Sequence, residues 1–89
     1  MRAVITVVGK DMVGILARVS EISSKNNVNV LEVTQSILQD VFAIVMLVDV
    51  TKCAVPFSSL ADELTDVGTK MNLKIHVMNE DIFNAMHHI

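Results

Sequence analysis

The chain has 89 residues, 52% of them hydrophobic, and a formal net charge of -3. This length predicts a single domain, the apolar content excludes a disordered chain, and the mildly acidic balance lacks the basic surface of nucleic-acid-binding domains. Cys53 is the one cysteine, which excludes an intrachain disulfide and a zinc site built from cysteines. We expect no cofactor. The apolar share is high for so small a domain, which indicates that part of the surface is buried against another chain.

Two features predict a soluble, cytoplasmic protein that does not contact membranes. The N-terminal apolar run ends at Gly9 and is too short for the core of a signal peptide. The longest uncharged apolar stretch, residues 41–48, is far shorter than the roughly 20 residues of a membrane span. The single cysteine also fits a reducing compartment.

The first half of the chain predicts a strand, a helix and a second strand. Residues 2–8 are β-branched and apolar on both faces, as in the middle of a sheet, and residues 9–11 form a turn. From residue 12 to residue 26 the apolar spacing becomes helical, with Asp11 at the expected N-cap position. The apolar stripe of this helix comprises Met12, Ile15, Leu16, Val19 and Ile22. Residues 28–38 then alternate, and their apolar face comprises Leu31, Val33 and Ile37.

The second half predicts a strand, a helix and a last strand. Residues 42–50 are again apolar on both faces until Asp49. A second helix spans residues 56–71 and begins either with Pro56 as its first residue or with Ser58 as its cap. Residues 73–78 alternate, as in a strand with one polar face.

The order of elements is β-α-β-β-α-β followed by a tail at residues 80–89 with helical apolar spacing, which predicts an α+β, ferredoxin-like sandwich. The first and third strands are apolar on both faces and should be central, whereas the second and fourth have a polar face and should be edges. The antiparallel sheet order 4-1-3-2 satisfies this with right-handed crossovers. Two helices cover only one face of the sheet, so a short C-terminal tail helix or a partner must cover the other.

Several kinds of site used by proteins of this plan lack their residues here. An RNA-recognition module needs several aromatic residues on its central strands, where this chain offers only Phe42. A metal chaperone needs paired cysteines in the first loop, and an acylphosphatase-like enzyme needs an arginine there; residues 9–14 contain neither. His87 and His88, with His76, could hold a divalent ion, but adjacent histidines at a chain end are more often solvated. We therefore expect no metal site and no enzyme.

The most informative stretch is the loop at residues 9–15, which joins a buried strand to a helix. A helix start offers unpaired N–H groups and a partial positive charge, which suit a small carboxylate. Gly14 allows close approach to the backbone, Lys10 adds a positive charge, and Asp11 can accept hydrogen bonds from an ammonium group. These features are complementary to a zwitterionic amino acid. The alternative is purely structural, with Asp11 as an ordinary N-cap and Gly14 fitted to a tight crossing of helix and sheet.

Two stretches of the sequence resemble the ACT domain family. They are V-V-G-K-D-M-V-G-I-L-A-R-V-S, which matches the family's G-x-D-x-x-G-[IL] loop, and N-N-V-N-V-L-E-V-T-Q, which matches its N-[IV] strand entry. The resemblance covers residues 2–77, although Val13 stands where many members carry proline. The tail E-D-I-F-N-A-M-H-H-I is similar to the ending of small stand-alone bacterial ACT proteins. Among functionally named relatives, the chain resembles the ACT modules of the glycine cleavage system transcriptional repressor.

The resemblance implies a single ACT domain over residues 1–89, with a core at about 2–79 and a tail at 80–89. ACT domains pair side by side through edge strands or stack face to face, so it implies a homodimer or a higher even oligomer. Effectors then lie between the first loop of one chain and the start of the second strand of the other. The implied ligand-binding residues are Lys10, Asp11, Met12, Val13, Gly14, Ile15, Asn29 and Leu31. Asn29 as a simple turn residue remains the alternative.

We therefore predict a regulatory ACT domain that acts as a homo-oligomer and binds a small molecule, which the resemblance indicates is an amino acid. The second strand, residues 28–38, supports pairing because it has neither proline nor lysine to block its edge. The alternative is a ligand-free oligomerisation or adaptor domain that docks an unknown protein partner through its open sheet face and C-terminal tail. A small enzyme is the least favoured class.

Overall fold

The computed structural model describes residues 1–10 and 14–87, except for the side chains of Leu38, Met86 and His87. The helices and strands in this part of the chain are β1 Arg2–Gly9, α1 Ile15–Lys25, β2 Asn29–Leu38, β3 Val41–Asp49, α2 Phe57–Lys70, β4 Lys74–Asn79 and α3 Glu80–His87. The predicted order of elements is confirmed, including a helix in the tail. None of the helices in the described residues is long and apolar enough to cross a bilayer.

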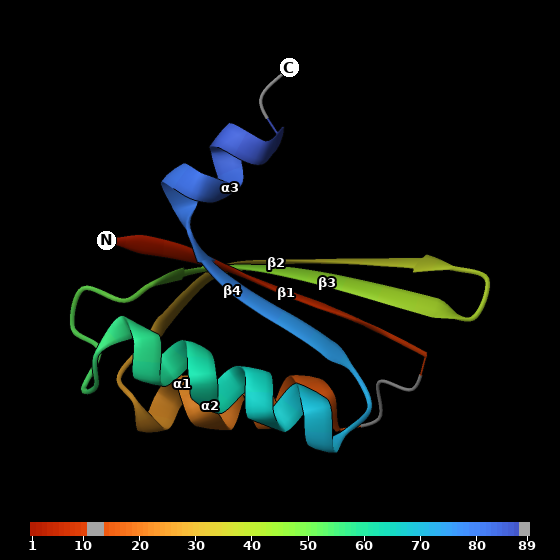
Figure 1. Cartoon of the computed structure of the whole chain (residues 1–89), viewed down its shortest axis with the longest axis horizontal. Coiled ribbons are helices and arrows are strands. Elements are labelled where there is room, and N and C mark those ends of the chain that lie inside the picture. The colour runs from red at the N-terminus through yellow and green to blue at the C-terminus, as the bar shows by residue number, and fades with distance from the viewer. Residues whose placement is uncertain (11–13, 88–89) are drawn as a thin grey trace.

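The four strands form one antiparallel sheet in the order β2-β3-β1-β4. This confirms the predicted order, read from the opposite edge. β1 and β3 are central because both of their faces are apolar: Ile5 and Val7 are buried toward α1 and α2, and Val4 is buried on the other face. Helices α1 and α2 cover one face of the sheet, and α3 projects from the opposite face (Figure 1).

The hydrophobic core lies between the sheet and the two covering helices. Each of these helices contributes a stripe at helical spacing, and the largest fully buried side chains of the core include Ile5, Ile15, Met46, Leu60 and Leu64. The first helix departs from its predicted stripe at Leu16, whose side chain is 42% exposed. Leu16 lies about 100° around the helix from Ile15, and the narrow covered face takes Ile15, Val19 and Ile22 instead.

Both helix starts differ from the prediction. α1 begins at Ile15, because the N-cap residue Gly14 has φ 78° and a left-handed residue cannot belong to a right-handed helix. Asp11, the expected N-cap, lies outside the described residues, and the N-cap position belongs to Gly14. α2 begins at Phe57 with Pro56 at its N-cap. Pro56 is therefore not the first helical residue, and Ser58 is not the cap.

A polar cluster ties the end of α1 to α2. The buried amide of Asn26 donates hydrogen bonds to the Ile22 carbonyl oxygen and to Glu63 Oε1, both at 3.0 Å. Lys25 Nζ donates to Glu63 Oε2 at 2.9 Å. The hydrogen bond from Lys25, and to a smaller extent that from Asn26, holds the pKa of the Glu63 carboxyl below its usual range. Glu63 is thereby fixed as the acceptor that joins the two helices.

This cluster predicts a specific loss of stability in acid. A carboxyl whose pKa is lowered by folding stabilises the native state above its unfolded pKa, about 4.3 for glutamate, and this stabilisation is lost as the pH falls through the native pKa. We expect the Tm of the wild-type protein to fall more steeply below about pH 4 than that of Glu63→Gln. Asp62→Asn, which removes an exposed carboxylate from the same helix, is the control and should keep the wild-type slope. Parallel Tm curves for wild type and Glu63→Gln would contradict the assignment.

Candidate ligand site at the first loop

The first loop starts where β1 packs tightly against the start of β4. Gly9 is the last residue of β1 and pairs with Phe42 of β3. A Cβ at Gly9 would overlap Leu73 Cδ2, so the absence of a side chain lets Leu73 close over the strand end. The sequence indicated a turn at Gly9; in the structure Gly9 still belongs to the sheet.

The loop ends at Gly14, which is exposed and in the left-handed conformation. Within the described part of the chain, no atom lies within 4 Å of the position that its Cβ would take. The Gly14 carbonyl oxygen accepts the hydrogen bond from the Arg18 amide at 3.0 Å, which starts the helix. Because glycine has no side chain to cap the amides of the first turn, this helix start can receive an external acceptor.

The other predicted loop residues have different surroundings. The Ile15 side chain is buried in the core, so a ligand cannot contact it without rearranging that core. Lys10 is exposed, and its Nζ lies 3.9 Å from Asp40 Oδ2 in the turn between β2 and β3. Asp11, Met12 and Val13 lie outside the described residues.

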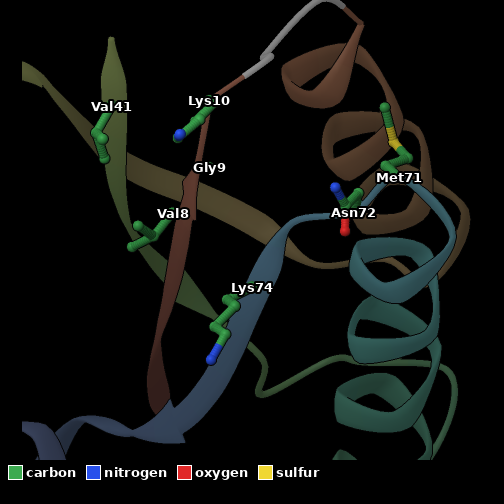
Figure 2. A pocket seen from close by; sticks show the side chains of 7 residues that line it. All are labelled: Val8, Gly9, Lys10, Val41, Met71, Asn72 and Lys74. Carbon is green, nitrogen blue, oxygen red and sulfur yellow. The ribbon is translucent and has the colours of Figure 1, made fainter. Parts of the chain in front are cut away.

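A pocket of about 550 Å³ adjoins the start of the loop. Its described lining comes from the end of β1, the start of β3, the end of α2 and the start of β4 (Figure 2), and comprises Val8, Gly9, Lys10, Val41, Met71, Asn72 and Lys74. The sequence motifs do not indicate Asn72 or Lys74. These two residues reach this place because β4 pairs antiparallel with β1, so that Lys74 lies opposite Val8. The predicted sheet order already places the first and fourth strands side by side.

The remaining predicted residues, Asn29 and Leu31, lie at the far end of the sheet. Asn29 pairs with Asp49, which pairs in turn with Arg2, at the opposite end of β1 from Gly9. Seven residue steps at about 3.3 Å each separate the two ends by about 23 Å. One chain therefore does not bring the two halves of the predicted site together.

Asn29 lines a second, polar pocket of about 470 Å³ at that end, together with Asn27, Asp49, Thr51 and Lys52. Hydrogen bonds from the Thr51 side chain and amide hold the pKa of the Asp49 carboxyl below its usual range. Leu31 is the extra residue of a β-bulge between Val30 and Glu32. The bulge gives β2 one residue more than β3 between these two pairs.

Strand β2 presents an open edge along its whole length. Every residue from 29 to 37 is exposed, and the large apolar side chains among them are Val30, Leu31, Val33 and Ile37. Only Glu32 carries a charge in this stretch. An edge with neither proline nor lysine is a template for pairing with another strand.

Comparisons with known proteins place the chain in a family. The model of the ACT domain matches residues 2–78. A UPF0237 family protein of Clostridium perfringens is 47% identical over 89 residues, which cover 100% of both chains. The ACT domain protein from Streptococcus pneumoniae has a TM-score of 0.79 and 34% identity over 93% of each chain. A candidate glycine cleavage system transcriptional repressor shares the fold, with a TM-score of 0.68 and 20% identity over 85% of this chain and 43% of its own. The resemblance seen in the loop and strand motifs is confirmed, and the chain belongs to the ACT domain family.

Proposed function

We propose that this protein is a regulatory module that binds a small amino acid at the seam between two copies joined through β2. ACT domains are commonly regulatory domains that bind small molecules and often form oligomers. The observation that supports the proposal is the separation of Gly14 and Asn29 at opposite ends of the sheet, beside an edge strand that nothing in the described chain blocks. A second copy brings the two halves together.

The strand register supports a pairing that would complete the site. Two β2 strands related by a twofold axis run antiparallel. Pairing centred on the middle of the strand sets Asn29 of one copy beside Leu38 of the other. Leu38 is opposite Val41, and the next residue of β3 is opposite Gly9. Asn29 of the second copy thus arrives at the end of the sheet where the first loop begins.

The groups gathered at this seam suit an amino acid. The backbone amides after Gly14, which that residue cannot cap, can hold the α-carboxylate. Lys10, at the other end of the loop, supplies a positive charge. The Asn29 amide both donates and accepts hydrogen bonds, so it can bind either end of a zwitterion. Asp11 is the proposed acceptor for the α-ammonium, and the exposed side chain of Leu31 is free to contact the ligand's side chain.

A panel of the twenty amino acids tests the proposal by thermal shift. A ligand at 100 times its Kd stabilises the folded state by about 2.7 kcal/mol, which raises the Tm of a domain this size by on the order of 10 °C. Gly14→Leu should abolish the shift by filling the open space beside the helix start. Gly14→Ala is the matched control: it carries the same left-handed strain, about 1 kcal/mol, but little bulk, and should keep the response. If none of the twenty shifts the Tm of the wild-type protein, the sensing proposal fails.

A second candidate function, a ligand-free adaptor, is supported by α3. Ile82 on this helix is 56% exposed, and the sheet face beneath α3 is apolar. Deleting residues 80–89 separates the two functions. The adaptor proposal predicts that the deletion changes the oligomeric state or the solubility while no amino acid binds the intact chain. Retention of the wild-type assembly after the deletion counts against it.

A further inference from the structure

The sheet face opposite α1 and α2 carries two adjoining pockets, which together are called the groove below. Beside the pocket at the first loop lies another of about 570 Å³, whose described lining comprises Thr6, Val8, Ala43, Ile44, Val45, His76, Met78 and Phe83. Val8 lines both pockets, so the two hollows adjoin. α3 stands over one end of this face (Figure 1), and its Phe83 forms a wall there. The groove therefore runs from α3 to the end of β1.

The floor of the groove is aliphatic over most of its length. Val8 of β1 is opposite Ala43 of β3, and Val45 is the next residue of β3 on the same face. Met78 of β4 and Phe83 of α3 complete the apolar end. Polar groups in this part are the Thr6 hydroxyl and the His76 imidazole. An apolar chain laid along this floor would be removed from water on one side and shielded by α3 at its tip.

The other end of the groove is cationic. Lys74 lies opposite Val8 in the sheet, and Lys10 and Asn72 line the same end (Figure 2). The described residues that line the two pockets include no carboxylate, although the whole chain carries a net charge of -3. Asp40 lies 3.9 Å from Lys10, but both side chains are largely exposed and such a pair is weak. Among the described residues that line this end, the charged side chains are those of Lys10 and Lys74.

We propose that this groove binds an amphiphilic anion, a medium-chain carboxylate. The carboxylate lies at Lys74, and the alkyl chain extends over Val45 toward Phe83. The row that contains Lys74 and the row that contains Met78 are four residue steps apart, which is about 13 Å. This is the span of a medium-chain acyl group rather than of a long one. The site and the ligand class differ from those of the proposed amino-acid seam, with which the groove shares Lys10.

A homologous series tests the apolar half of the proposal. Sodium hexanoate, octanoate and decanoate are titrated into the full chain by calorimetry and by amide NMR, below their micelle concentrations. Each buried methylene should tighten Kd about fourfold, with shifts concentrated at Val8, Val45 and Met78. Octan-1-ol, with the same chain and no charge, should bind at least about tenfold more weakly than octanoate, because charge-assisted bonds are lost. Equal affinity of the alcohol, no dependence on chain length, or shifts confined to other surfaces would overturn the proposal.

Two pairs of variants test the residues. Lys74→Glu should weaken octanoate binding at least about tenfold, whereas Lys70→Glu, the same charge change on α2 beside Asp66, should leave it unchanged. Val8→Asp should also weaken binding, and Leu16→Asp, at a similarly exposed position on α1, should not. If octanoate does not bind and Val8→Asp instead dissociates an oligomer in sedimentation, the face joins two copies of the chain and the proposal is wrong. Gly14→Leu should keep octanoate binding, so failure here is distinguishable from failure of the amino-acid proposal.

Discussion

Leu64→Ala is expected to lower the free energy of unfolding by about 3–4 kcal/mol, a large part of the 5–15 kcal/mol typical of small domains. Leu64 of α2 is fully buried among core residues from both helices and the sheet. Its truncation removes buried methyl groups and leaves a cavity that the packed sheet cannot fill. Urea denaturation monitored by circular dichroism measures the change from the shift in the midpoint.

Leu16→Ala is the matched control, because Leu16 also belongs to a predicted helical stripe but is 42% exposed. Alanine has slightly better helix propensity than leucine, and little buried surface is lost. We expect a change below about 1 kcal/mol. Equal losses for Leu16→Ala and Leu64→Ala would show that α1 is packed differently from the structure described above.

Val33→Lys is expected to convert the proposed dimer into monomers at micromolar concentration. Val33 lies at the middle of β2, where a twofold pairing sets each residue near its own copy. The two lysines are then diagonal neighbours at about 7–8 Å. They repel by about 2 kcal/mol at an effective dielectric constant of 20, which weakens the dimer by about 30-fold. Lysine on an edge strand is also the usual device that blocks pairing. Size-exclusion chromatography with light scattering measures the mass.

The control for this variant is Leu16→Lys, which adds the same charge at a similarly exposed apolar position on α1. It should keep the wild-type mass. A wild-type protein that is monomeric at micromolar concentration would contradict pairing through β2. A Val33→Lys protein that remains a dimer would show that the copies meet through another surface, and the open sheet face is the first alternative.

The strand order could be predicted from the sequence because the residues on each face of a strand are apolar where that face is buried. β1 and β3 are apolar at successive positions, since one face meets α1 and α2 and the other lies beneath α3 or the groove. β4 alternates because Ile75 is buried and His76 is exposed. These patterns determine which strands are central and which are edges, and hence the observed order.

The details that could not be predicted are local features that leave no trace in the spacing of apolar residues. The apolar spacing predicts a helix from residue 12, but α1 begins at Ile15, directly after the left-handed Gly14. The bulge at Leu31 shifts the register of β2 by one residue, which alternation alone does not reveal. Leu16 has the correct spacing for a wide stripe, and only the width of the covered face leaves it exposed.

The candidate site was predictable in part. The loop motif indicated an open helix start, and Gly14 has that geometry. Lys74 and Asn72 were missed because they are distant in sequence and join the pocket only through the pairing of β1 with β4. Ile15 was assigned to the ligand from the family motif, whereas its side chain belongs to the core. The prediction that His87 and His88 hold no metal ion concerns side chains that lie outside the described part of the structure.

In the proposed dimer two chains build each amino-acid site, one giving the loop and the other giving Asn29. Complementation between Gly14→Leu and Asn29→Ala tests it most directly, using the amino acid with the largest thermal shift. Neither variant alone should bind. After unfolding and refolding the two together in equal amounts, half of the dimers are mixed and each has one intact site, so native mass spectrometry should find about a quarter of the wild-type ligand occupancy. A mixture that binds no ligand, or an Asn29→Ala protein that binds as well as wild type, would contradict a site shared between two copies.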